Sequence, residues 1–191
     1  MGYMQGRLYY VVGPSGAGKD TLLRLARESL DGSVNLVFAH RYITRPHQDK
    51  NENHVALSDK EFTMRAARGC FAMQWDSHGY SYGVGVEIQE WLASGLCVVV
   101  SGSREYLPEA LKRFPDLTLI WVSAPAVLLR ERLYTRGREE GAAIQQRLAR
   151  AQTYAVPSRP PDLLLDNSGA PEAAARELAT YLREQCLLRK R

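Results

Sequence analysis

A glycine-rich stretch near the start of the chain limits most strongly what this sequence can fold into. It consists of Gly13, Pro14, Ser15, Gly16, Ala17, Gly18, Lys19, Asp20 and Thr21. An apolar run, 8–12, precedes it and a helical pattern, 21–30, follows it. The pattern G-x-x-x-x-G-K between a strand and a helix predicts a P-loop, whose backbone N–H groups surround phosphate oxygens. The alternative is a glycine-rich turn without a ligand, which the lysine and the strand–helix context disfavour.

Lys19 and the two residues after it carry the chemistry of this loop. We expect Lys19 to reach the β- and γ-phosphates of ATP, beside the positive end of the helix dipole. Asp20 stands where the pattern has Ser or Thr, whose hydroxyl holds Mg²⁺, and Thr21 comes one residue later. Asp20 and Thr21 are therefore the candidate metal ligands. The alternative for Asp20 is a helix-start carboxylate stabilised by the dipole alone.

Composition sets the class of protein and of ligand. The chain has 191 residues, a net charge of +4 and a pI of about 9.0, which suits one α/β domain and a polyanionic small molecule. The basic run at 189–191 is expected to be a solvated helix end, so we expect no nucleic-acid partner. The longest apolar stretch, 117–129, is too short and interrupted to span a membrane. Three cysteines without C-x-x-C spacing and no visible signal peptide predict reduced thiols in a cytoplasmic protein.

Strand and helix patterns alternate along the chain. Strands are predicted at 8–12, 36–39, 97–100, 117–122 and 163–165. Helices are predicted at 21–30, 87–93, 106–113, from 125 up to a charged loop at 135–140, and at 142–154 and 172–188. In the helix that begins at Pro125, we expect Val127, Leu128 and Leu133 on the inner side. Such alternation predicts an α/β fold with a parallel sheet flanked by helices.

A second region interrupts this alternation. The stretch 40–53 is polar and predicted to be irregular, a capping box at Ser58 and Glu61 starts a helix that runs to about 68, and 71–82 form a hairpin. We expect a single domain, 1–191, with a core over 7–39 and 95–188. The interrupting region, about 40–94, is then a small subdomain over the ligand-binding end.

Arginines concentrate after the predicted strand 117–122. Arg130, Arg132, Arg136 and Arg138 lie at a helix end and its loop, and Arg147 and Arg150 share a face of the next helix. Phosphoryl transfer needs fixed positive charge that closes over the reacting oxygens, so these residues predict an arginine-rich lid at about 134–147. The alternative is a pair of solvated basic helices.

From end to end the chain resembles the guanylate kinase family of P-loop kinases. The resemblance is carried by 13–19, by Ile43-Thr44-Arg45, by the hairpin 78–83, by 132–138 with 144–148, and by Asp166-Asn167. It implies ATP and Mg²⁺ as cofactors and a catalytic role for Lys19, Asp20, Arg136 and Arg147. It also implies that Arg132 and Asn167 bind ATP.

The departures from that family concern the acceptor. Gln48 replaces its second acceptor arginine, Val84 and Val86 replace hydroxyl residues of the base pocket, and the acidic motif of the central strand becomes Ser101-Gly102-Ser103. Asp76 falls where the family carries its guanine-reading glutamate. Buried polar groups provide base specificity, so guanine recognition is weakened but not excluded.

Four longer segments resemble one branch of the family, the ribose 1,5-bisphosphate phosphokinases of phosphonate utilisation. They are Gly18-Lys19-Asp20, 39–45, 52–58 and 82–88. The resemblance implies transfer of the ATP γ-phosphoryl group to the 5-phosphate of this sugar bisphosphate, with Arg41, Arg45, Tyr82 and Arg104 at the acceptor. For the arginines the alternative is surface charge. Two other functions stay open, a GMP kinase and a non-catalytic module that binds proteins. The oligomeric state is not predicted.

Overall fold

Two β-sheets organise the computed structural model, which describes residues 6–30, 32, 34–46, 53–135 and 159–188. The larger sheet has the strand order β2-β7-β1-β8-β9, and every neighbouring pair is parallel. Its strands are β1 (Leu8–Val12), β2 (Leu36–Phe38), β7 (Cys97–Ser101), β8 (Thr118–Ser123) and β9 (Leu163–Asp166). The predicted parallel sheet is therefore confirmed.

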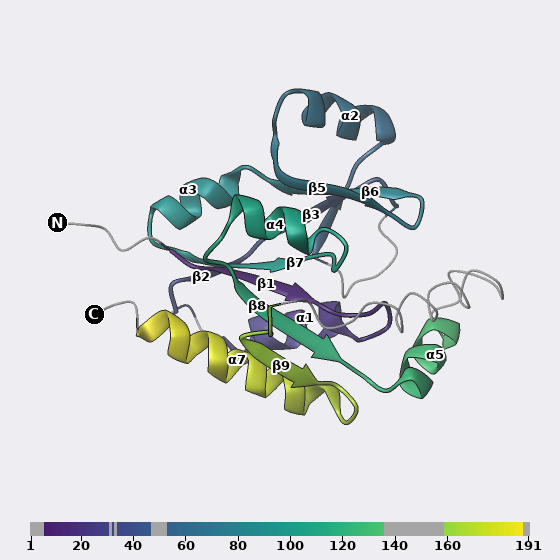
Figure 1. Ribbon diagram of the computed structural model, residues 1–191, viewed down its shortest axis with the longest axis vertical. Helices are drawn as coiled ribbons and strands as arrows, with labels where there is room; N and C mark the ends of the chain where they lie inside the picture. Colours follow the sequence, from purple (N-terminus) through teal and green to yellow (C-terminus); the bar gives the residue numbers. More distant parts are fainter. Residues whose placement is uncertain (1–5, 31, 33, 47–52, 136–158, 189–191) are drawn as a thin grey trace.

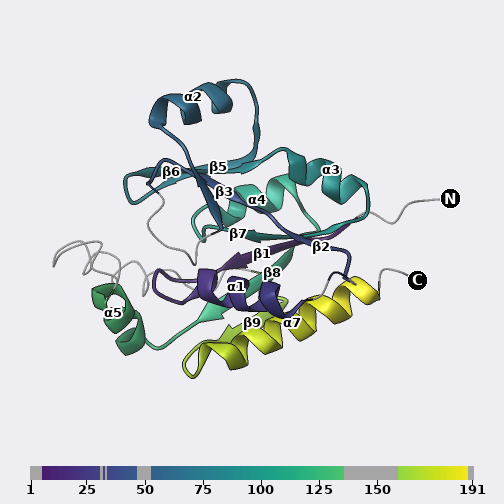
Figure 2. The ribbon, with the colours of Figure 1, turned by 180° about the vertical axis from the view of Figure 1, so that it is seen from behind.

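Helices cover both faces of this core sheet (Figures 1 and 2). On one face lie α1 (Lys19–Ser29) and α7 (Pro171–Leu187), and on the other α3 (Glu87–Ala93) and α4 (Leu107–Arg113). Side chains of β1 alternate between the two hydrophobic cores, since Tyr9 and Val11 pack on the α1–α7 side while Tyr10 and Val12 pack on the other. A strand buried on both faces explains why this run is apolar throughout.

The second sheet lies above α4 and β7 in Figure 1. It has the order β4-β3-β6-β5, built from β3 (Arg41–Ile43), β4 (His54–Ala56), β5 (Phe71–Ser77) and β6 (Tyr80–Gly85). Helix α2 (Asp59–Ala67) begins where predicted, because Ser58 accepts a hydrogen bond from the Glu61 N–H at 3.2 Å. This sheet falls within the stretch predicted as a subdomain.

Two expectations about local structure are wrong. The polar stretch 40–53, expected to be irregular, contains strand β3, which pairs with β4 on one side and with β6 on the other. Pairing with neighbours decides strand formation here, and a polar composition hides it from the sequence. In α5 (Ala126–Thr135), Val127 is 69% exposed, because the buried residues Leu129 and Leu133 define the opposite face of that helix.

The three cysteines are thiols, as expected. Cys97 and Cys186 are buried in the α1–α7 core, with their sulfurs 4.0 and 3.9 Å from the hydroxyl oxygen of Tyr9. Burial raises the pKa of this tyrosine, so the hydroxyl stays neutral. Cys70 is only half-buried and precedes β5. None of the described helices combines the length and the hydrophobicity that crossing a membrane requires.

Candidate active site

The P-loop connects β1 to α1 at the carboxyl end of the core sheet. Gly16 and Gly18 have φ angles of 85° and 84°, in the left-handed region that glycine adopts without a steric penalty. Gly18 is the N-cap of α1 and provides no side-chain cap, which leaves the first N–H groups of the helix available to an anion. The Lys19 ammonium group donates to the carbonyl oxygens of Gly13 at 2.9 Å and Pro14 at 3.4 Å. The loop therefore has the geometry that phosphate binding requires.

Asn167 and Arg132 support the P-loop from the other side. Asn167 follows β9, is 2% exposed and donates from Nδ2 to the Ala17 carbonyl oxygen at 2.7 Å. Arg132 of α5 donates from Nη2 to the Asn167 carbonyl oxygen at 3.0 Å. Asn167 Oδ1 and Arg132 Nη1 are buried and have no hydrogen-bond partner among the residues that the structure describes. A buried acceptor and a buried donor beside the P-loop are positions where a ligand gains hydrogen bonds.

Asp20 links the P-loop helix to the second sheet. Its Oδ1 accepts from Arg41 Nη2 of β3 at 2.8 Å and from the Ser101 hydroxyl at the end of β7 at 3.3 Å. The side chains of Asp20 and Arg41 are 16% and 12% exposed. A pair this sheltered from water is screened far less than a surface ion pair, so each charge depends on the other. Sequence reasoning singled out both residues but missed their contact, because 21 positions separate them.

The same residues fit a magnesium ion. Mg²⁺ binds oxygen ligands and in kinases uses one or two carboxylates together with substrate phosphates and water. Asp20 supplies a carboxylate directly after Lys19, and Ser101 supplies a hydroxyl within hydrogen-bond distance of it. Within the described part of the chain there is no group of three or more His, Cys, Asp or Glu side chains that could hold a metal by itself. Asp20 could thus hold Mg²⁺ only with phosphates and water completing the shell.

A rigid turn follows β7 and fixes the position of Ser101. The Tyr10 hydroxyl donates to the Ser103 carbonyl oxygen at 3.1 Å and accepts from the Ser103 N–H at 3.0 Å. A Cβ atom at Gly102 would come within 2.1 Å of the Tyr10 ring, so only glycine fits between them. Arg104 continues this turn and is half-buried.

Strand register decides which side chains of the second sheet share a surface. Residues directly opposite in a ladder lie on the same face, and faces alternate along each strand. Arg41 pairs with Val84, Ile43 with Tyr82, and Trp75 with Tyr82. We call this surface the inner face. Its members in the ladders are Arg41, Ile43, His54, Ala56, Met73, Trp75, Ser77, Tyr80, Tyr82 and Val84. Arg45, which follows β3, joins it through its contact with the Tyr80 ring. Three of the four predicted acceptor residues, Arg41, Arg45 and Tyr82, thus lie on one face.

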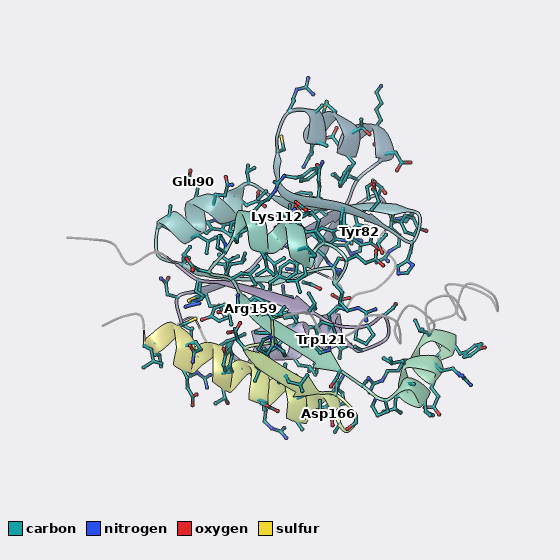
Figure 3. The ribbon with its side chains drawn as sticks, in the orientation of Figure 1. Tyr82, Glu90, Lys112, Trp121, Arg159 and Asp166 are labelled. Carbon is teal, nitrogen blue, oxygen red and sulfur yellow. The ribbon has the colours of Figure 1, made fainter. Side chains whose placement is uncertain are left out.

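Aromatic rings join the inner face to the core. Trp75 and Tyr82 stack with ring centroids 5.6 Å apart and an interplanar angle of 4°. The Trp75 ring also packs against the ring of Tyr106, the residue that precedes α4, with the two ring centroids 5.5 Å apart. Tyr82 lies between the hairpin and the core sheet (Figure 3). No motif in the sequence points to Trp75 or Tyr106 as site residues. For Trp75, the polar residues on either side of it in β5 could have indicated that its side chain faces the interior.

The hairpin end carries one arginine and one carboxylate on opposite faces. The Arg45 guanidinium lies 5.9 Å from the centroid of the Tyr80 ring, on the inner face. Asp76 pairs with Ser81 in the ladder, on the outer face, and accepts from the Ser81 hydroxyl at 2.6 Å. The expected place of Asp76 at a guanine-reading position is therefore not supported, since its carboxylate faces away from Tyr82.

Comparison with known proteins identifies the family. No protein-family model matches the chain. A protein of Thiobacillus denitrificans named ribose 1,5-bisphosphate phosphokinase PhnN is 56% identical over 80% of this chain and 80% of its own length. Proteins of the same name from Burkholderia pseudomallei and Chromobacterium violaceum are 52% and 51% identical, over 92% and 93% of this chain and 95% and 94% of theirs. The chain belongs to the PhnN family of kinases.

The fold of this PhnN-family chain also matches a solved structure. A guanylate kinase from Anaplasma phagocytophilum superposes with a TM-score of 0.67, over 98% of this chain and 89% of that chain, at 16% identity. At this identity the match establishes the guanylate kinase-like fold and nothing about the substrate. It agrees with the P-loop kinase fold that the sequence predicts.

Several predicted site residues of this PhnN-family chain fall outside the described residues. They are Arg136 and Arg147, with most of the predicted lid and the helix at 142–154. Thr21 is described and half-buried in the first turn of α1. The structure thus brings together Lys19, Asp20, Arg41 and Ser101 at one end of the core sheet, with Arg132 and Asn167 beside the P-loop.

Proposed function

We propose that this protein transfers the γ-phosphoryl group of ATP to the 1-phosphate of ribose 1,5-bisphosphate, forming 5-phosphoribosyl 1-pyrophosphate. The 5-phosphate, named as the acceptor in the sequence analysis, is not the reacting group, because the product carries its pyrophosphate on C1. The observation that carries the proposal is the inner face of the second sheet. It has two arginines, Arg41 and Arg45, and among its described members neither an amide nor a carboxylate. Such a face suits an acceptor with two phosphates and no base to recognise. The names of the relatives agree with it.

On the donor side, the P-loop backbone and Lys19 hold the ATP phosphates. Asn167 Oδ1 is suited to accept a hydrogen bond from the adenine amino group, and Arg132 Nη1 to donate to the same nucleotide, because both are buried without partners among the described residues. A bound Mg²⁺ would neutralise charge that develops on the transferred group. Asp20 and Thr21 are its proposed protein ligands.

On the acceptor side, Arg45 binds the reacting 1-phosphate together with the Tyr82 hydroxyl, and Arg41 and Arg104 add positive charge. An oxygen of the 1-phosphate bonds to the γ-phosphorus, while the bond from that phosphorus to the bridging oxygen of ADP breaks. A phosphate monoester has its second pKa near 6, so the nucleophile is ionised at neutral pH and needs no general base. Catalysis then depends on position and positive charge.

Arg136 and Arg147 are proposed to close over the transferred group. Their role rests on the arginine-rich sequence and on its resemblance to lid segments of the family. Charges that act mainly in the transition state change turnover more than they change ATP affinity.

The decisive test compares acceptors. Purified protein with ATP and Mg²⁺ should convert ribose 1,5-bisphosphate to the pyrophosphate, measured by phosphorus NMR and by coupled ADP release. GMP should have a kcat/KM lower by about a hundredfold or more, because two unmet polar groups of a purine contribute about 1–3 kcal/mol each. A higher kcat/KM for GMP would replace the proposal by a GMP kinase.

A further inference from the structure

A pocket beside the ion pair of Asp20 and Arg41 is lined by both apolar and basic side chains. Its walls come from α1, from the end of β2, from β3 and from β7. The apolar residues that line it are Leu23, Phe38, Ala39 and Val99. Two further arginines of α1, Arg24 and Arg27, also line it, and the sequence analysis assigned no function to either.

The pocket follows one face of α1. Asp20, Arg24 and Arg27 succeed one another at intervals of four and three residues, which places all three on the same side of a helix. With a rise of about 1.5 Å per residue, Arg24 lies about 6 Å and Arg27 about 10.5 Å along the axis from Asp20. Asp20 directly follows Lys19, so it marks the end of the pocket nearest the P-loop, and the two arginines lie toward the other end.

One donor of Arg24 lacks an acceptor. Its Nη1 donates to both carboxylate oxygens of Glu28 at 2.8 Å, whereas its Nε is buried and has no hydrogen-bond partner among the described residues. Phosphate oxygens form strong charge-assisted hydrogen bonds with guanidinium N–H groups. A phosphate bound beside Arg24 would therefore satisfy this donor, with the exposed Arg27 one turn further along the helix as a second cation.

Arg41 connects this pocket with the inner face of the second sheet. It lines the pocket, and in the ladder of β3 with β6 it stands on the face that carries Tyr82. A single acceptor molecule can thus extend from the inner face past Arg41 into the pocket.

We infer that this pocket binds the 5-phosphate of the acceptor, the phosphate that does not react. The inference rests on the proposed function, in which the 1-phosphate receives the γ-phosphoryl group beside Lys19 and Asp20. The sugar then separates the two phosphates along α1, with the reacting one at the Asp20 end and the 5-phosphate beside Arg24 and Arg27. The apolar side chains of the pocket suit the carbon atoms of the ribose.

Arg24 and Arg27 then determine specificity, because they contact a part of the acceptor that the reaction leaves unchanged. Ribose 5-phosphate keeps this contact, whereas ribose 1-phosphate lacks the group that makes it. The two monophosphates therefore distinguish the pocket from the reacting end of the site.

The test measures binding of both monophosphates and of ribose 1,5-bisphosphate by calorimetry, in the presence of Mg²⁺ and ADP. Arg24→Gln should weaken binding of the bisphosphate and of ribose 5-phosphate about tenfold, the scale of one hydrogen bond to a charged group. Arg27→Gln should weaken both about threefold, because water and salt screen an exposed charge. Binding of ribose 1-phosphate and of ADP should stay unchanged in both variants, which also shows that they fold.

Two control variants separate the pocket from other effects of these changes. Glu28→Gln breaks the ion pair with Arg24 but keeps the guanidinium group, so it should not weaken binding of ribose 5-phosphate. Arg176→Gln, at an exposed position of α7 outside the pocket, removes one positive charge and should also leave that binding unchanged.

The remaining outcomes would overturn the assignment. Equal weakening of all three sugars, weakening of ribose 1-phosphate alone, or no weakening of any would show that the pocket does not hold the 5-phosphate. Wild-type turnover of ribose 1,5-bisphosphate would uphold the proposed function in each of these cases. Absence of that turnover would overturn the proposed function instead, since the contrast between the two monophosphates is measured without any reaction.

Discussion

The two halves of the candidate active site differ in whether their polar groups already have partners within the protein. The nucleotide half, made of the P-loop with Arg132 and Asn167, leaves a buried donor and a buried acceptor without partners among the described residues. In the acceptor half, the inner face with Asp20 and Ser101, described contacts already engage the charges. Arg41 is paired with Asp20, and Arg45 lies against the Tyr80 ring.

This difference predicts two kinds of response to a ligand. In the nucleotide half, Asn167 Oδ1 and Arg132 Nη1 gain hydrogen bonds when a ligand arrives and give up none among the described residues. In the acceptor half, a phosphate or a metal ion must compete with internal partners, so part of its binding energy is used to separate them. Variants of Lys19 should change catalysis or affinity with little change in stability, whereas variants of the Asp20–Arg41 pair should change stability as well.

The largest effect is expected for Lys19→Ala. Turnover should fall by at least about a hundredfold, the scale of removing one electrostatic donor from a transition state. The melting temperature should stay close to that of the wild type, because the Lys19 ammonium group donates to carbonyl groups of its own loop and joins no separate elements by these bonds.

Lys112→Ala is the matched control for this variant. Lys112 is an exposed lysine of α4 that pairs with the nearby Glu109 of the same helix, so its loss should leave turnover unchanged. Near-wild-type turnover of a folded Lys19→Ala protein would show that the P-loop does not take part in the reaction.

Changes to the two members of the Asp20–Arg41 ion pair should lower stability alike but shift the Mg²⁺ requirement in opposite directions. Either single change, Asp20→Asn or Arg41→Gln, should lower the free energy of unfolding by about 1–3 kcal/mol, because a sheltered polar group is left without its partner. Asp20→Asn should raise the Mg²⁺ concentration needed for half-maximal rate by about tenfold. Arg41→Gln should lower it, since the carboxylate is no longer neutralised.

Urea denaturation and Mg²⁺ titration of both variants measure these effects. The double variant should lose less stability than the sum of the two single losses. If the Mg²⁺ requirement is the same in all variants, Asp20 acts only as a helix-start carboxylate.

A smaller effect is expected for Asn167→Ala. The Michaelis constant for ATP should rise about fivefold, as for one neutral hydrogen bond of about 1 kcal/mol. Asn35→Ala, which removes an exposed amide that donates to the Gly95 carbonyl oxygen, should leave ATP kinetics unchanged. A change in turnover without a change in the Michaelis constant for ATP would show that Asn167 stabilises the transition state and not bound ATP.

The smallest effect is expected for Asp76→Ala. Because its carboxylate lies on the outer face with Ser81, kcat/KM for ribose 1,5-bisphosphate and for GMP should each change by less than about twofold. A selective loss of the reaction with GMP would show that Asp76 reads the base after all.

The sequence predicted the nucleotide half better than the acceptor half. The P-loop and the central strands could be predicted because a contiguous motif or a continuous apolar run signals each of them. Asn167 was assigned to ATP only through the resemblance to the guanylate kinase family. The parallel order of the core strands followed from the alternation of strands and helices.

The acceptor half depends on contacts between residues far apart in the chain. Arg41 lies in a short polar strand whose existence depends on pairing with β4 and β6, and the face of Asp76 depends on register. The contact of Trp75 with Tyr106 and that of Asp20 with Arg41 each join separate elements. Spacing along the sequence carries no signal for such contacts.

The three thiols can report how often two different regions of this protein open. Cys70 is half-buried at the start of β5, whereas Cys97 and Cys186 surround Tyr9 inside the α1–α7 core. A thiol-labelling reagent needs an exposed thiolate, so its rate at each site follows how often that site opens. Cys70 should be labelled early, through local opening around the second sheet, and the other two only when the core sheet unfolds. Labelling followed by mass spectrometry would thus compare the rate of local opening around the second sheet with the rate of unfolding of the core sheet, without any mutation.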